Sequence, residues 1–166
     1  HIGKEMWKVG SEHPFMSLAK TGPLTAWIVD KLSDPNEQNQ KISLESTCKK
    51  NKITLVLFWR SNCSHCEEFH PILKSIYEKY HSQGLEVYAI SIDKNIEDWK
   101  KHILSNPSPW INVFAPLQER NTLVRLYPSP STPTIIALDN KGRVISRLIV
   151  RSKLENFLEE NKAYFK

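Results

Sequence analysis

The sequence predicts a single α/β domain with a mixed β-sheet and helices on both of its faces. The residues 53–59 form a nearly continuous apolar run, typical of a strand covered on both sides. A helical pattern of apolar residues follows, and then a second apolar run at 85–92. Strand, helix and strand in this order indicate a right-handed parallel crossover. Two later apolar runs around the turn at 139–142 indicate a hairpin, which makes the sheet mixed.

The other expected elements follow in chain order. Residues 1–52 are an N-terminal extension, in which strands at 27–32 and 41–44 form a hairpin across the turn at 33–40. Ser43 is expected to cap a short helical turn. Gly84 should close the central helix. The remaining expectations are helices at 96–104, 119–126 and around 154–158, and strands at 110–114, 134–138 and 144–150.

Composition limits the classes of function. With 40% hydrophobic and 25% charged residues in 166, the chain is typical of one globular domain, and it contains no run of about 18 apolar residues that would suggest a membrane span. The net charge is +5, but Lys and Arg are scattered among Asp and Glu, so we expect no nucleic-acid partner. Three cysteines are too few for a disulfide scaffold, so their spacing carries the information.

The cysteine motif Cys63-Ser64-His65-Cys66 stands directly after the buried strand and at the start of the helix. In that position a C-x-x-C indicates redox chemistry. The helix N-terminus stabilises an anion, which lowers a thiol pKa from about 8.5 into the range of roughly 3.5 to 7.5. We therefore predict that Cys63 is the nucleophile and that Cys66, one turn further in and more buried, is the resolving thiol.

Charged neighbours should tune this dithiol in opposite directions. A protonated His65 would stabilise the Cys63 thiolate and make the disulfide a stronger oxidant. Glu67 and Glu68 favour the first helical turn but repel a nearby thiolate. The net direction depends on distances that the sequence does not give.

These residues carry a resemblance to a known family. Trp59, Cys63, Cys66 and Pro71 match the thioredoxin-fold signature, and Ser131-Thr132-Pro133-Thr134 looks like its cis-proline loop. The start of the chain, Val9-Gly10 with Pro14-Phe15, resembles the TlpA/ResA-like branch of the AhpC/TSA and redoxin superfamily, as does an insertion at about 93–129. The resemblance implies a single thioredoxin-like domain over residues 1–166. Its core spans 53–162 and is preceded by an N-terminal strand extension.

The resemblance also implies a function and a setting. A bacterial thiol-disulfide oxidoreductase would exchange disulfides with partner proteins and receive electrons from an upstream thiol-disulfide donor. It would be exported, periplasmic or tethered to the membrane facing the periplasm, monomeric, and without a cofactor beyond the Cys63–Cys66 disulfide. Supporting roles fall to Trp59, Ser64, His65, Glu68 and Pro71. Pro133 would be cis, and Thr132 would offer its backbone to a partner chain.

The chain departs from the family at three positions. Leu57 stands where thioredoxins keep a buried Asp, and Phe69 stands where ResA-like proteins keep a Glu. The usual proton acceptor for Cys66 is therefore missing. Glu68 or His70 would replace it only if its side chain turns toward the site. Asn62 stands where thioredoxin has a second Trp, which indicates a more polar docking surface.

Three other interpretations of the function remain open. A peroxiredoxin needs a Pro and a Thr or Ser where this chain has Val56 and Arg60. A zinc site would need Cys48 to join the C-x-x-C pair and His70. The third alternative is a thioredoxin-like interaction module with little turnover. Cys48 is most simply an inert, buried thiol, and Trp110 a core residue of the inserted region.

Overall fold

The computed structural model describes residues 9–10, 43–114, 132–146 and 149–166, built around a five-stranded sheet. In chain order its elements are α3 (Leu44–Lys50), β1 (Ile53–Trp59), α4 (Ser64–Tyr80), η2 (His81–Gln83), β2 (Leu85–Ser91), α5 (Ile96–Ser105), β3 (Ile111–Phe114), β4 (Thr134–Asp139), β5 (Val144–Ser146), η3 (Arg151–Lys153), α7 (Leu154–Glu160) and η4 (Lys162–Phe165). The predicted N-terminal strand at 27–32 and the helix at 119–126 lie outside the described residues. No helix within the described ranges is long and apolar enough to cross a membrane.

The sheet is mixed, as predicted, with the strand order β3-β2-β1-β4-β5. β2 runs parallel to both β1 and β3, whereas β4 is antiparallel to β1 and to β5. The turn between β4 and β5 is closed by Asp139, whose carboxylate accepts from the backbone N–H groups of Lys141 and Arg143. This order places β1 in the middle of the sheet, where its nearly all-apolar sequence belongs.

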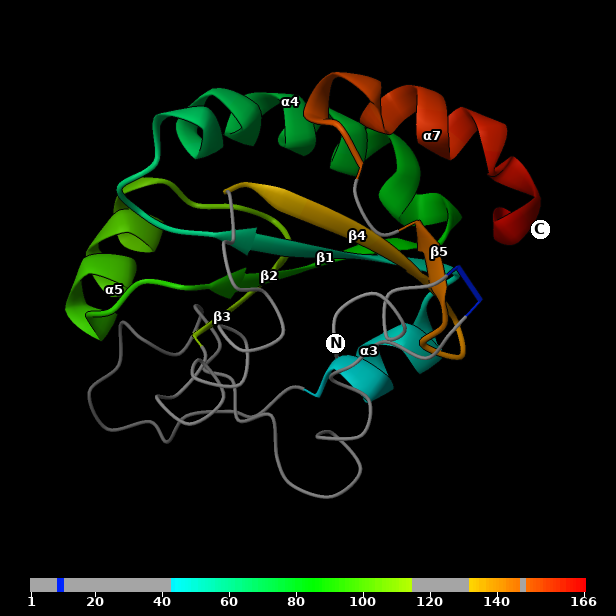
Figure 1. Cartoon of the computed structure of the whole chain (residues 1–166), viewed down its shortest axis with the longest axis horizontal. Helices are drawn as coiled ribbons and strands as arrows, with labels where there is room; N and C mark the ends of the chain where they lie inside the picture. Colours follow the sequence, from blue (N-terminus) through cyan, green and yellow to red (C-terminus); the bar gives the residue numbers. More distant parts are fainter. Residues whose placement is uncertain (1–8, 11–42, 115–131, 147–148) are drawn as a thin grey trace.

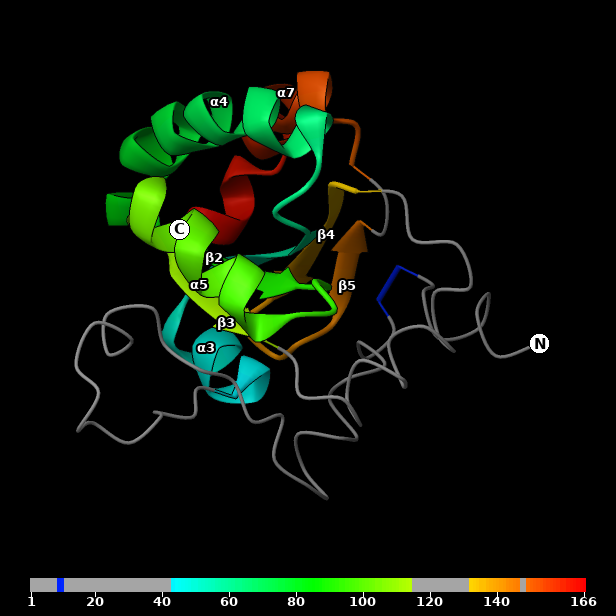
Figure 2. The ribbon, with the colours of Figure 1, turned by 90° about the vertical axis from the view of Figure 1, so that its left-hand side faces the viewer.

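The two faces of the sheet have separate cores, and β1 supplies both by alternation. Its residues Ile53, Leu55, Leu57 and Trp59 pack on the face covered by α4 and α7. Val56 and Phe58 pack on the opposite face, together with Leu44 and Cys48 of α3. Figures 1 and 2 show α3 on one side of the sheet and α4 with α7 on the other, which confirms the predicted layers.

Helix α4 connects β1 to β2 and carries the cysteine motif at its first turn. The spacing of apolar residues indicates a helix from Glu67 onward, but the helix begins three residues earlier, at Ser64. It does so because Cys63 acts as the N-cap. The helix continues through Pro71, whose missing N–H leaves one main-chain bond unmade. Its buried side chains are Phe69, Leu73, Ile76, Tyr77 and Tyr80.

Several element boundaries differ from the sequence-based predictions. Leu44 opens α3 instead of ending a strand, because the Ser43 hydroxyl accepts the backbone N–H of Ser46 at 3.0 Å and caps the helix. α4 ends at Tyr80, and a 3-10 turn continues the chain to Gly84, which has a φ of +116°. A Cβ at that glycine would lie 2.5 Å from Cγ of Lys52, so the close approach also requires glycine. The last strand, β5, ends at Ser146.

Candidate active site

The cysteine pair lies at the N-terminus of α4, directly after the central strand. Cys63 is the N-cap residue and is joined to Cys66 by a disulfide, with their Cα atoms 5.2 Å apart. The Cys63 Sγ atom accepts the backbone N–H of Cys66 at 3.2 Å. When the disulfide is reduced, this N–H and the helix dipole favour the thiolate of Cys63 over its thiol. The arrangement supports Cys63 as the nucleophile of the pair.

Thr132 meets Cys63 from the loop that leads into β4. Its hydroxyl Oγ1 lies 3.2 Å from the Cys63 Sγ atom and donates to it. The carbonyl oxygen of Thr132 lies 3.5 Å from the same sulfur, within reach of the thiol hydrogen that reduction would create. The peptide bond between Thr132 and Pro133 is cis. The fold therefore brings Thr132 into contact with the reactive sulfur, although the two residues are 69 positions apart in the sequence.

The burial of the two cysteines is the reverse of the prediction. Cys63 is buried, with 8% of its surface exposed, whereas Cys66 is half-buried. The physical reason is that Thr132 lies against the Cys63 sulfur, while Cys66 borders a cavity. The nucleophilic role of Cys63 thus depends on its position at the helix N-terminus and not on greater exposure.

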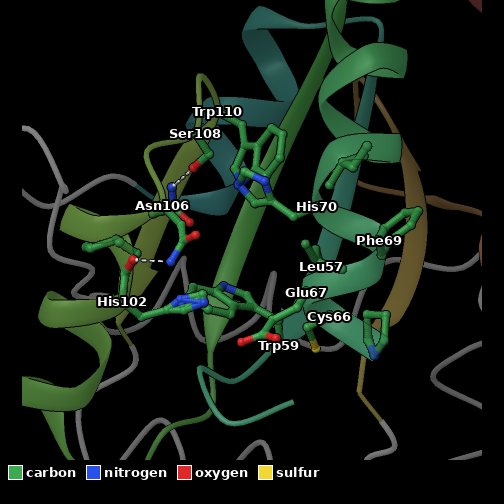
Figure 3. A pocket seen from close by; sticks show the side chains of 14 residues that line it. Leu57, Trp59, Cys66, Glu67, Phe69, His70, His102, Asn106, Ser108 and Trp110 are labelled. Carbon is green, nitrogen blue, oxygen red and sulfur yellow. Dashed lines mark hydrogen bonds between the residues drawn. The ribbon is translucent and has the colours of Figure 1, made fainter. Parts of the chain in front are cut away.

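The cavity beside Cys66 has a volume of about 80 Å³ and lies between α4, α5 and the end of β1 (Figure 3). The positions of the missing acids, Leu57 and Phe69, both line it and are both buried. Its full lining is Leu57, Trp59, Cys66, Glu67, Phe69, His70, Leu73, His102, Ile103, Asn106, Ser108, Trp110, Asn112 and Pro133. The resolving cysteine therefore opens onto a mainly apolar cavity that also contains two imidazoles.

The two imidazoles come from different helices and keep nitrogen atoms free. Nε2 of His70 and Nδ1 of His102 are buried and make no hydrogen bond within the described part of the chain. The His70 ring lies 5.2 Å from the Trp110 ring, and the His102 ring lies edge-on to Trp59 at the same centroid distance. Burial, reinforced by the positive charge of Lys74, lowers the pKa of His70 below its usual value.

Other predicted site residues lie around the first turns of α4. Trp59 is buried at the end of β1 and lines the cavity. Ser64 is exposed as the first residue of the helix, and Pro71 is exposed further along it. His65 and Glu68 are also exposed, with Nδ1 of His65 3.6 Å from Oε2 of Glu68. Glu68 thus pairs with His65 and does not line the cavity, whereas His70 does.

A buried carboxylate that no sequence pattern predicted as part of the site holds the corner before Cys63. Asp93 accepts the backbone N–H and the hydroxyl of Ser61, at 3.0 Å and 2.7 Å, and the hydroxyl of Ser91 at 2.7 Å. These bonds join the loop after β1 to the end of β2. The only signal in the sequence was a Ser-x-Asp directly after an apolar strand. Asp93 therefore positions the corner from which α4 starts.

The zinc set considered from the sequence is not assembled. No group of three or more His, Cys, Asp or Glu side chains in the described ranges is arranged to hold a metal ion. Cys48 lies in the core on the α3 face, while Cys66 packs against the core on the α4 face. Burial raises the pKa of the Cys48 thiol to about 12. Cys48 is thus a buried, unreactive thiol at neutral pH.

A buried strand that leads into a C-x-x-C disulfide at a helix N-terminus, facing a cis-proline loop, defines a thioredoxin-like protein. The chain belongs to the thioredoxin-like family, whose pattern matches residues 51–144, more than half of its length. The comparisons below agree with the TlpA/ResA-like resemblance seen in the sequence.

Named relatives and solved structures share this fold. Nucleoredoxin of Mus musculus is 30% identical over 119 residues, which are 70% of this chain but 27% of that protein. The chain thus spans about a quarter of the nucleoredoxin length. The thiol-disulfide oxidoreductase ResA of Bacillus cereus is 24% identical, over 74% of this chain and 70% of its own.

Among solved structures, the thioredoxin domain of a thiol-disulfide oxidoreductase from Bacteroides vulgatus is 26% identical. The match has a TM-score of 0.74 and covers 93% of this chain and 97% of that one. A thiol:disulfide interchange protein from a Bacteroides species is also 26% identical, with a TM-score of 0.73 over 93% of this chain and 90% of its own.

Proposed function

We propose that this chain is a thiol-disulfide oxidoreductase that exchanges disulfides with partner proteins through Cys63 and Cys66. The observation that carries the proposal is the position of Cys63, which caps helix α4 while its sulfur accepts the N–H of Cys66 and the hydroxyl of Thr132. Each of these contacts stabilises negative charge on that sulfur. Cys63 attacks a partner disulfide, and Cys66 then attacks Cys63 to release the reduced partner.

The loop at Thr132 and Pro133 is the proposed docking site for the partner polypeptide. Thr132 already contacts the reactive sulfur, and Pro133 lines the adjoining cavity, so a chain bound along this loop has its own sulfur beside Cys63. In this mode of recognition, an extended peptide binds through main-chain hydrogen bonds, as an added strand does. Support for this role comes from the match to the family's cis-proline loop.

The cellular setting is also a proposal. The matches to bacterial ResA and to Bacteroides structures described as thiol-disulfide oxidoreductases support an exported bacterial protein that works in the periplasm or on its membrane. In such a compartment disulfides form and persist, so an upstream thiol-disulfide donor is required to reduce the Cys63–Cys66 bond again. The protein acts as a monomer in this scheme.

The test is to trap the reaction half-way. In the Cys66→Ser variant, Cys63 attacks a disulfide-bonded substrate such as insulin, and the mixed disulfide persists because the resolving thiol is absent. Mass spectrometry of the alkylated product should locate the bond at Cys63. The matched Cys48→Ser variant should keep the wild-type rate of insulin reduction, because Cys48 lies on the far side of the sheet. If the wild type shows no turnover and the Cys66→Ser variant no trapped adduct, the chain is an interaction module instead.

A further inference from the structure

Resolution by Cys66 needs a proton acceptor that the usual positions do not supply. In the mixed disulfide on Cys63, Cys66 is a thiol, and only its thiolate attacks. Leu57 and Phe69 occupy the places of the expected acids and are both buried and apolar. Glu68, the acidic substitute considered from the sequence, pairs with exposed His65. The base must therefore come from another side chain that reaches the Cys66 cavity.

His70 is placed to be that base. It follows Cys66 by four residues on α4, a spacing that puts two side chains on the same helical face with Cβ atoms about 5–6 Å apart. Both residues line one cavity. In Figure 3, Cys66 lies at the end of the cavity near Trp59, and His70 one turn further along, near Trp110. The cavity volume of about 80 Å³ is enough to hold water between the two side chains, since about 10–15 Å³ of such volume already holds one water molecule.

We propose that His70 accepts the proton of Cys66 during resolution, directly or through cavity water. This rests on the proposed disulfide exchange. Neutral His70 takes the proton from the Cys66 thiol, and the resulting thiolate attacks the Cys63 sulfur of the mixed disulfide. The Cys63–Cys66 bond forms as the bond from Cys63 to the partner breaks, and the partner leaves as a thiolate. That thiolate takes up a proton from the imidazolium of His70 or from solvent, so protons and electrons balance.

The surroundings of His70 keep it neutral and available. The titratable and charged groups that face it are Lys74 on its own helix, His102 from α5, and Cys66 and Glu67 around the same cavity. Burial and the positive charge of Lys74 disfavour the imidazolium, so the imidazole is in its basic form at neutral pH. Its Nε2 is buried and has no hydrogen-bond partner among the described residues, so it is free to accept a proton.

The two other candidates in the cavity are less suitable. Glu67 is exposed at the rim, where water solvates its carboxylate. His102 also has a free nitrogen but comes from α5, so no helical spacing holds it beside Cys66, and its ring lies edge-to-face with the Trp59 ring. It serves as a second arm of the test.

The experiment measures the resolving step alone. A peptide is attached to Cys63 of the reduced protein as a mixed disulfide at low pH, and its release is followed by stopped flow after a jump to each pH between 5 and 9. His70→Gln should slow release at pH 7 by about 10²-fold, the usual contribution of a positioned base. It should also remove the fall in rate that the wild type shows on the acid side, where His70 becomes protonated at a pH below the usual histidine value. Free imidazole should restore part of the rate in His70→Ala.

A matched control shows whether the effect depends on where the histidine lies or only on the loss of a histidine. His81→Gln makes the same change at an exposed histidine beyond α4, and it should leave both the rate and its pH profile unchanged. A normal release rate in His70→Gln, or a slow release in His102→Gln alone, overturns the proposal. Failure of the exchange reaction itself is recognised separately, because in that case the Cys66→Ser variant forms no adduct at Cys63.

Discussion

The two faces of the central sheet treat their cysteines in opposite ways. On the α3 face, Cys48 is packed among Val56, Phe58 and Leu138, with 1% of its surface exposed. On the α4 face, Cys66 borders a cavity that contains polar side chains, and its partner Cys63 caps a helix. Strand β1 contributes side chains to both faces.

The reactivity of each thiol is set by the groups that the fold places against it. Burial among hydrocarbon side chains removes the solvation that a thiolate needs, so Cys48 stays protonated. At the helix N-terminus, N–H and O–H donors replace that solvation around the Cys63 sulfur. Hydrocarbon surroundings therefore keep Cys48 inert, whereas donors at a helix N-terminus activate Cys63.

The two cysteines should differ most strongly in their rates of thiol labelling. In the reduced Cys66→Ser variant, only Cys48 and Cys63 remain as thiols. At pH 7 a pKa of about 12 leaves about one Cys48 in 10⁵ as thiolate, whereas Cys63 at a helix N-terminus is expected to be largely ionised. Iodoacetamide should therefore modify Cys63 at least about 10³-fold faster than Cys48, as measured by peptide mass spectrometry.

Denaturation provides the control for that comparison. In urea both thiols lose their environments, and their labelling rates should become nearly equal. Comparable rates in the folded protein would mean that the α3 face opens readily, and the contrast between the faces would be lost.

An intermediate effect is expected when one leucine on each face is shortened. Leu138→Ala on the α3 face removes a fully buried side chain and should cost about 4 kcal/mol of unfolding free energy. Leu57→Ala should lower the unfolding free energy by less, about 2–3 kcal/mol. Leu57 already borders the cavity, so its side chain makes fewer contacts that the substitution can remove. Urea unfolding of the oxidised proteins measures both. Equal costs would show that the cavity closes in solution.

The smallest expected effect is on stability between pH 5 and 7. The pKa of His70 is lowered in the folded protein, so below about 6.5 the unfolded chain binds more protons than the folded one. Stability should therefore fall as pH drops through this window, and His70→Gln should make the dependence shallower.

Cys48 affects stability at alkaline pH, because its raised pKa makes stability fall as pH rises above about 9. A pH series of thermal unfolding checks both directions, with Cys48→Ala as the matched variant, and an unchanged slope in His70→Gln would contradict the assignment.

Much of the fold was predictable because its signals are local. The apolar run of β1, the three-and-four spacing of α4 and the turn after β4 each depend on neighbours within one element. The cysteine motif was equally clear, since strand, corner and helix are contiguous. By contrast, the strand at 41–44 was wrong at Leu44, where a capping hydroxyl on Ser43 outweighed the apolar pattern.

The details of the site were less predictable because they join distant residues. Asp93 binds Ser61 across 32 positions, and no spacing rule connects them. The cavity brings His102 beside Trp59 only after α5 packs against the sheet. The relative burial of the cysteines was predicted wrongly for the same reason, since it depends on Thr132. His70 was named from the sequence as a substitute base, and the structure places it in the cavity beside Cys66.

The contact between Thr132 and Cys63 also bears on how the protein acquires its activity. β1, α4 and β2 are consecutive, so their contacts form over short loops, whereas Thr132 reaches Cys63 only when β4 pairs with β1. Closing so long a loop is a slow, non-local event in folding. The dithiol also precedes Thr132 in the chain, so it is synthesised before the residue that covers its nucleophile. The contact between Thr132 and Cys63 accordingly forms late in folding and reports that β4 has paired with β1.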